Sequence, residues 1–301
     1  MSTTKLSYGP VLFNWSPETW RDAHFRIADE APIDSVQLGE IVCSKRAPFL
    51  APHLPAVIER LQAAGKEVIL ASPALVTTER ERQAVRELIE SADLPIEAND
   101  IGALPHLANR PHMVGPLVNV YNEQALAWMA KRGATRVTLP AEIAGPAIAT
   151  IAAAAQALSV EVEVQVFGRL PLAISARCYH ARALGLHKDG CQFVCGQDAD
   201  GMEVTTLDGE AFLAVNGTQT LSQSYHALLP ELRPLTEAGV TRFRLWPHAC
   251  DTVAVARLFR DVLDGHAEPG PALETLRGLL GGAELANGYY HGKRGVAFAA
   301  E

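Results

Sequence analysis

Five cysteines are the residues in this 301-residue sequence that most clearly suggest chemistry, because three of them lie within one short stretch. The three are Cys178, Cys191 and Cys195, whereas Cys43 and Cys250 stand alone. Several thiolates together are the soft ligands that zinc and iron–sulfur clusters select. Spacing alone does not separate these two metals. The sequence therefore predicts a metal site of open identity.

The elements that must position these cysteines are extended runs alternating with helix-like stretches. Helices are indicated by an N-cap at Ser16-Pro17, a charged stretch at 78–92, an alanine-rich stretch at 146–157 and a final amphipathic stretch at 252–263. Strict alternation predicts parallel strands, and eight of them suggest an α/β fold, a closed (β/α)8 TIM-like barrel. The runner-up, an open doubly wound sheet, lacks a Gly-x-Gly-x-x-Gly after its first strand. The expected strands are 11–14, 35–38, 67–71, 96–98, 113–117, 136–139, 160–167 and 242–246.

A long insertion separates the seventh expected strand from the eighth. Its cysteine-rich and hairpin part spans residues 178–220. Runs 202–208 and 212–215, joined by Asp208-Gly209, are typical of a β-hairpin. No linker or low-complexity tract interrupts the chain, so we expect residues 1–301 to form a single barrel domain.

The expected barrel fold also indicates where the cysteines lie. Segments after strands two and seven both emerge at the C-terminal face, so Cys43 could meet Cys178, Cys191 and Cys195 at one rim. Cys191 and Cys195 would share one face if their segment is helical. Alternatively, these thiols are ordinary buried small side chains. Nearby cations could offset the charge of four thiolates or form a solvated surface: Lys45, Arg46, Arg177, Arg182 and Lys188.

Polar residues near the expected strand ends are candidates for a pocket at the barrel mouth. Catalytic groups of such barrels lie at the C-terminal ends of strands, although each residue could instead cap a helix or lie in a loop. Glu163 lies within the seventh strand on the same face as Glu161, which suggests a polar barrel interior. The strand-end candidates are Asn14, Glu40, Asn119 and Glu142.

Composition excludes several other classes of protein. The formal charge of −8, with 26 basic and 34 acidic residues, is a poor match for nucleic acid. No apolar run is long enough for a membrane span, and the N-terminal residues do not resemble a secretory signal. We therefore expect a cytoplasmic protein, whose odd number of cysteines does not form a disulfide framework.

The stretch 161–178 resembles the signature of the peptidase-like family that includes the collagenase-like YegQ proteins. Glu163, Gly168, Leu170 and Cys178 match that signature. One departure stands where a branch of the family carries a cluster-ligating cysteine, namely Pro171. The other departures are Gln165, Arg169 and Ala176.

Nearly the whole chain is similar to the UbiV branch of this family, also called YhbV, which carries a cysteine after the second strand instead. The resemblance implies one 4Fe–4S cluster on Cys43, Cys178, Cys191 and Cys195, with Cys250 structural. It also implies a heterodimer with UbiU that hydroxylates the ring of a ubiquinone precursor without oxygen. UbiT would carry the lipid and prephenate would donate the oxygen. The similar phrases are 38–46, 119–122, 139–142, 168–178, 215–220 and 287–289.

Three other functions stay open or are disfavoured. A cluster or a zinc ion could be purely structural, making the chain a non-catalytic scaffold for its partner. Relatives that hydroxylate RNA bases suggest a third function, which the acidic composition disfavours. Peptidase activity is disfavoured because cysteines committed to metal leave no obvious nucleophile, and no His-Glu-x-x-His motif is present.

Overall fold

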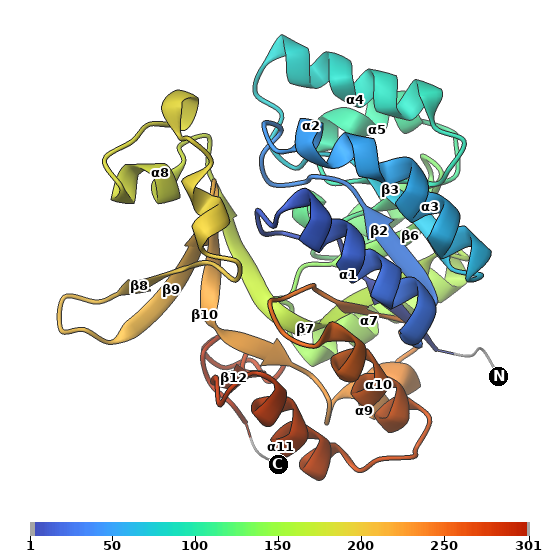
Figure 1. Ribbon diagram of the computed structural model, residues 1–301. Helices are drawn as coiled ribbons and strands as arrows, with labels where there is room; N and C mark the ends of the chain where they lie inside the picture. Colours follow the sequence, from blue (N-terminus) through green and yellow to red (C-terminus); the bar gives the residue numbers. More distant parts are fainter. Residues whose placement is uncertain (1–3, 300–301) are drawn as a thin grey trace.

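Eight parallel strands form a closed barrel in the computed structural model, which describes residues 4–299 (Figure 1). Each barrel strand pairs with the next, and the last pairs with both the seventh and the first, so the barrel is closed. The predicted (β/α)8 barrel is confirmed. Its strands are β1 (Lys5–Tyr8), β2 (Ser35–Leu38), β3 (Glu67–Ala71), β4 (Ile96–Ala98), β5 (His112–Val114), β6 (Ala134–Leu139), β7 (Glu161–Ile174) and β11 (Arg242–Leu245).

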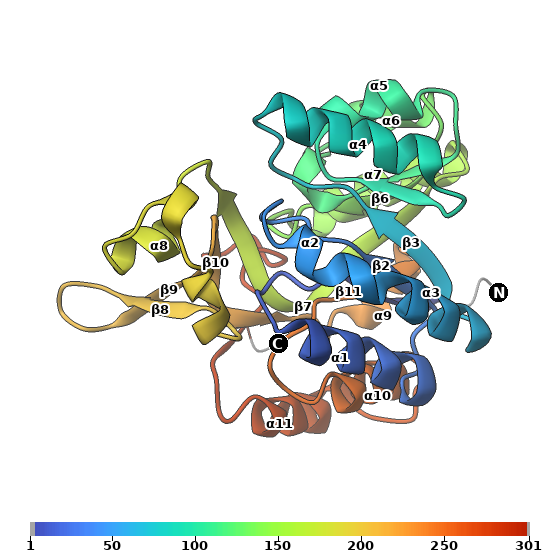
Figure 2. The same ribbon diagram turned by 45° about the horizontal axis from the view of Figure 1, so that its top comes forward.

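Helices cover the outside of the barrel (Figures 1 and 2). The Ser16 hydroxyl accepts a hydrogen bond from the Thr19 amide, as its N-cap position predicts. No helix within residues 4–299 is both long and apolar enough to cross a membrane. The helices around the barrel are α1 (Pro17–Glu30), α2 (Ala47–Leu50), α3 (Leu54–Ala63), α4 (Glu79–Ser91), α5 (Leu104–Leu107), α6 (Glu123–Ala130), α7 (Gly145–Ala157), α9 (Leu232–Glu237), α10 (Thr252–Leu263) and α11 (Pro269–Leu279).

The insertion forms an arm on one side of the barrel (Figure 1). The outer part of β7 leaves the barrel and pairs antiparallel with β10 (Gln219–Ala227), which continues past residue 220. The predicted hairpin is present as β8 (Met202–Thr205) and β9 (Ala211–Asn216). The short helix α8 (Tyr179–Ala183) lies above this sheet, and β12 (Leu285–Ala286) adds to β10.

Three local predictions were wrong. The first strand is Lys5–Tyr8 rather than 11–14, because only the earlier residues reach the ladder of β11. The loop that follows buries Val11, Leu12 and Phe13. The apolar run 11–13 is therefore a sign of burial and not of a strand. The strand expected at 113–117 ends at Val114 in β5. The helix at 252–263 is not the last, since α11 follows it.

Charged side chains fill the barrel interior, where branched apolar residues are usual. Arg244 donates hydrogen bonds to Glu97 and Glu163, and to the Thr138 hydroxyl at 3.0 Å. A second ionic layer lies toward the N-terminal end, made by Glu67, Arg136, Glu161 and Arg242. The polar interior expected from the alternation in β7 is therefore present.

Candidate functional site

Four cysteines from distant parts of the chain line one pocket at the rim of the barrel. Cys43 comes from the loop after β2, whereas Cys178, Cys191 and Cys195 come from the insertion that follows β7. Cys178 is the N-cap of α8, and its sulfur accepts a hydrogen bond from the Ala181 amide at 3.4 Å. The barrel connectivity thus brings together thiols that are 152 positions apart in the chain, from 43 to 195.

Cys191 and Cys195 do not share a helix face, which corrects the conditional prediction from their spacing. Gln192 and Phe193 between them have positive φ angles of 49° and 54°. This left-handed backbone turns the chain sharply between two 3₁₀ turns, so both thiols still face the pocket. The Phe193 ring stacks edge-on against Phe49, 4.8 Å between centroids, at this end of the pocket.

Arg46 is a buried cation beside these thiols, with only 2% of its surface exposed. Its guanidinium lies 3.4 Å from the Cys195 sulfur and donates a 2.7 Å hydrogen bond to the Asn216 side-chain oxygen. Gly217 leaves room for it, since a Cβ there would lie 2.2 Å from an Arg46 nitrogen. A buried positive charge at this place would stabilise anionic sulfur ligands.

Asn14 and Glu40 lie beside the cysteines rather than in the barrel-mouth pocket predicted for them. The Asn14 amide nitrogen is 3.4 Å from the Cys195 sulfur. Glu40 is buried and accepts hydrogen bonds from the backbone amides of Val42 and Cys43, at 2.8 and 2.9 Å. Glu40 therefore shapes the loop that presents Cys43.

The thiols influence one another's ionisation. Burial raises the pKa of Cys43, Arg46 opposes that shift, and the nearby Cys195 adds to it. Burial likewise raises the pKa of Cys178, and both Cys191 and Cys195 contribute. The free thiols of Cys43 and Cys178 therefore favour the protonated form, and metal binding there would displace protons.

The arrangement differs from a site for one metal ion. Within residues 4–299, no group of three or more His, Cys, Asp or Glu side chains is placed to bind a single ion. His180 is buried, with its Nδ1 3.2 Å from the Val215 carbonyl oxygen. It does not line the cysteine pocket.

A second pocket, of about 300 Å³, opens at the C-terminal mouth of the barrel. It contains the predicted candidates Asn119 and Glu142, together with Tyr121 and Gln165, which sequence reasoning did not select. The Tyr121 hydroxyl donates a hydrogen bond to Glu142. Gln165 could have been found by continuing the inward alternation of Glu161 and Glu163 by two residues.

Glu163 lies deeper, inside the barrel, and does not line that pocket. Burial alone would raise the pKa of Glu163, but the charges of Arg244 and Arg136 hold it at about 2. Its carboxylate is therefore paired in the ionic interior of the barrel. This position agrees with the polar barrel interior expected from the alternation in β7.

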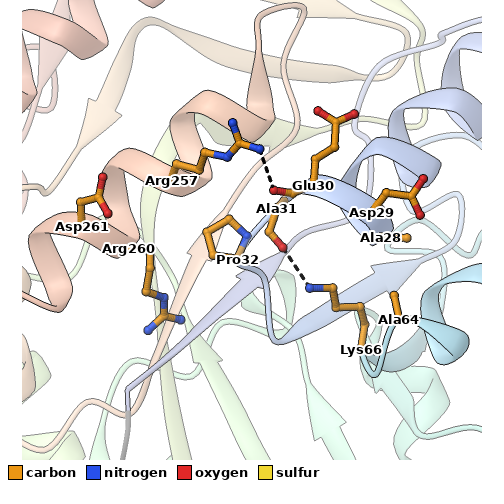
Figure 3. Close-up of a pocket in the computed structure, with 10 residues that line it drawn as sticks. All are labelled: Ala28, Asp29, Glu30, Ala31, Pro32, Ala64, Lys66, Arg257, Arg260 and Asp261. Carbon is orange, nitrogen blue, oxygen red and sulfur yellow. Dashed lines mark hydrogen bonds between the residues drawn. The ribbon is translucent and has the colours of Figure 1, made fainter.

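The N-terminal face of the barrel carries a wide, open hollow between α1, α3 and α10 (Figure 3). Lys66 and Arg257 donate hydrogen bonds there to the carbonyl oxygens of Ala31 and Glu30, at 2.9 and 3.1 Å. These cations satisfy carbonyls at the C-terminal end of α1, where positive charge is favourable. The hollow is thus a feature of helix packing.

Cys250 is not placed to act as a nucleophile. Burial and the neighbouring Asp200 raise the pKa of Cys250 to about 12. The nearby His248 has both ring nitrogens engaged, one 2.6 Å from Asp200 and the other 3.0 Å from the Arg169 amide that donates to it. No free imidazole nitrogen remains there as a base for this thiol.

Fold and site together define a (β/α)8-barrel protein with a cysteine-lined pocket at its rim. Residues 20–297 match Peptidase family U32, and the chain belongs to this family. Among solved structures, it is similar to the DAHP synthase of Thermotoga maritima, with 11% identity and a TM-score of 0.43 over 94% of this chain and 72% of that one. It is also similar to a truncated 3-deoxy-D-arabino-heptulosonate 7-phosphate synthase from the same organism. That structure has 11% identity and a TM-score of 0.44, and the match covers 94% of this chain and 90% of that one.

Proposed function

We propose that this U32-family protein is an iron–sulfur subunit of an oxygen-independent hydroxylase that acts on the ubiquinone ring in bacterial ubiquinone biosynthesis. The observation that carries the proposal is that Cys43, Cys178, Cys191 and Cys195 line one pocket. This is the ligand set of the UbiV branch, in which a cysteine after the second strand compensates for the residue at Pro171. The similarity to that branch along nearly the whole chain supports the assignment.

The donor set fits a 4Fe–4S cluster. Four thiols face the pocket, no carboxylate or imidazole lines it within residues 4–299, and Arg46 and Lys188 provide positive charge. Four cysteine thiolates are the ligand set that such a cluster requires, and four cysteines line this pocket. When bound, the cluster would supply one-electron redox chemistry at this rim.

The chain's own residues would hold and adjust that centre. Arg46 and Asn14 both place a nitrogen 3.4 Å from the Cys195 sulfur. Hydrogen bonds to ligating sulfur raise the reduction potential of a cluster, so both side chains favour its reduced form. In the proposed reaction UbiU completes the heterodimer, UbiT delivers the ubiquinone precursor and prephenate donates the oxygen.

The first prediction concerns the cluster itself. Protein purified without air should be brown, with broad visible absorbance that bleaches on exposure to oxygen. Cys43→Ser should remove most of that absorbance and the bound iron, because serine is a poor ligand for an iron–sulfur cluster. Cys250→Ser is the matched control and should keep both, since Cys250 does not line the pocket.

The same variant separates a hydroxylase subunit from a scaffold. If the Cys43→Ser protein still binds UbiU but the complex no longer hydroxylates the ring, the cluster takes part in the reaction. Loss of the complex itself would favour a structural cluster that stabilises the partner. A colourless, oxygen-indifferent protein with stoichiometric zinc would overturn the iron assignment.

A further inference from the structure

The barrel-mouth pocket has a lining that limits the charge of its ligand. Its lining includes the apolar residue Leu117 and, from the outer part of β7, Leu172 and Ile174, while most of its lining surface is polar. Its polar side chains are Asn119, Tyr121, Glu142 and Gln165. No lysine, arginine or histidine of the described chain lines it. A volume of about 300 Å³ is at the lower end for ligand sites, suited to a single substituted ring.

Gln165 is the deepest of these polar groups, with 1% of its surface exposed. Neither its amide nitrogen nor its amide oxygen has a hydrogen-bond partner among the described residues. Leaving both atoms unpaired in a buried position is costly, so the amide is suited to a ligand. A hydroxyl group can pair with both atoms, because it donates to the oxygen and accepts from the nitrogen.

The rim favours neutral ligands for a separate reason. Among the described residues, Glu142 is the one charged side chain in the lining, and it accepts a hydrogen bond from the Tyr121 hydroxyl. Burial and this carboxylate raise the pKa of Tyr121 to about 12, so the phenol stays protonated and keeps donating its hydrogen bond to Glu142. A carboxylate ligand would meet the Glu142 charge at the rim and the Gln165 carbonyl oxygen at the floor, with no cation to compensate.

We propose that this pocket binds a neutral ring that carries a hydroxyl group, anchored by Gln165, and rejects carboxylates. That the bound ring is the substrate rests on the proposed function, which this inference makes more specific. It implies that an anionic oxygen donor does not bind in this pocket. Binding itself requires no cluster chemistry, so it can fail or succeed independently of the iron assignment.

The test measures binding of two small probes to the anaerobically purified protein by ligand-observed NMR titration. p-Cresol is neutral at pH 7 and 4-methylbenzoate is an anion of similar size. p-Cresol should bind and 4-methylbenzoate should bind at least about tenfold more weakly. Gln165→Met, which keeps the volume and removes the amide, should weaken p-cresol binding by about tenfold or more.

Two further variants make the result decisive. Gln37→Met removes another buried amide with two unpartnered atoms, outside the pocket lining, and should leave p-cresol binding unchanged. Glu142→Gln should strengthen 4-methylbenzoate binding several-fold. Equal or tighter binding of the benzoate by the natural sequence overturns the proposal, as does equal behaviour of Gln165→Met and Gln37→Met. Failure of p-cresol to bind also overturns it, even when the protein is brown.

Discussion

Gly217 illustrates how one residue controls the surroundings of the cysteines. It lies in the tight turn between β9 and β10 with φ at +67°, and it lines the cysteine pocket. Its missing side chain lets the Arg46 guanidinium reach Asn216 and the Cys195 sulfur. Both the backbone conformation and the close approach therefore require glycine at this position.

We predict that Gly217→Ala destabilises the protein more than Gly209→Ala. Both glycines have positive φ, at +67° and +84°, so both substitutions incur a backbone cost of about 1 kcal/mol. Only at Gly217 would the new Cβ collide with Arg46, whereas nothing lies within 4 Å at Gly209. Overpacking should add about 1–3 kcal/mol to the loss in free energy of unfolding.

Chemical denaturation of the anaerobic protein, with iron content as a second readout, measures this difference. Gly217→Ala should also lose bound iron, because displaced Arg46 no longer contacts the Cys195 sulfur. Gly209→Ala, at the hairpin tip, serves as the control for backbone strain alone. Equal losses for the two variants would contradict the steric argument.

Among single residues, those whose roles follow from strand connectivity were the most predictable. The four cysteines could be related from the sequence because loops after β2 and β7 share one face of a barrel. Asn14 and Glu40 were assigned to the other pocket, since sequence shows that a residue follows a strand but not which way its loop turns. The alternation in β7 could have placed Gln165 among the inward-facing residues, but only coordinates reveal that both polar atoms of its amide are unpaired.

At the scale of elements, the strand β7 contributes to the barrel interior, to the mouth pocket and to the arm that carries three of the cysteines. Its inner part contributes Glu163 to the barrel interior, and its outer part forms a wall of the mouth pocket and carries the arm. Gly168 marks the transition, with φ at +119° and a hypothetical Cβ 2.7 Å from the His248 ring. The sequence predicted the strand only to residue 167, because a glycine and Pro171 interrupt the alternating pattern beyond it.

The capping of α4 also reaches the cysteine pocket. Thr78 accepts a hydrogen bond from the Glu81 amide while Glu81 accepts one from the Thr78 amide, so the two form a capping box. Glu81 additionally accepts a 2.7 Å hydrogen bond from the hydroxyl of Ser44, the residue after Cys43. The N-terminus of this helix therefore holds the loop that presents Cys43.

We predict that Thr78→Ala lowers the free energy of unfolding by about 1 kcal/mol, because the Glu81 amide loses its acceptor. Thr78→Ser keeps a hydroxyl at the same position and should retain most of that stability. Urea denaturation of both variants at pH 7 measures the difference. Equal stability of the alanine and serine variants would show that the cap contributes nothing.

On the scale of the whole molecule, the barrel is held together by an ionic interior as well as by its outer apolar layer. Arg244 is fully buried and bridges Glu97 and Glu163, which are also fully buried. These residues come from β11, β4 and β7, so the cluster crosses the barrel. Removing one partner from such a cluster leaves uncompensated buried charge.

We predict that Arg244→Met lowers the free energy of unfolding at pH 7 by about 3–5 kcal/mol, because Glu97 and Glu163 then lose the cation that bridges them. The triple variant Arg244→Met, Glu97→Gln, Glu163→Gln should recover much of this loss, since it removes the buried charges altogether. Denaturation of the single and triple variants measures both effects. A triple variant no more stable than Arg244→Met would contradict the role of charge.

The stability that Arg244→Met loses should depend on pH, which the loss of side-chain packing alone would not cause. In the natural protein Arg244 holds the pKa of Glu163 at about 2 against burial, so its stabilising charge persists above the ordinary value of 4.5 and is lost as the pH falls toward 2. In Arg244→Met the larger of the two opposing charges is lost and burial raises the pKa of Glu163, so folding takes up protons and the variant gains stability relative to the natural protein as the pH falls. The deficit of Arg244→Met should therefore narrow between pH 8 and pH 5.5, a range in which the natural protein changes little at this site. A deficit that stays constant over that range would mean that lost packing, and not unpaired charge, sets the cost.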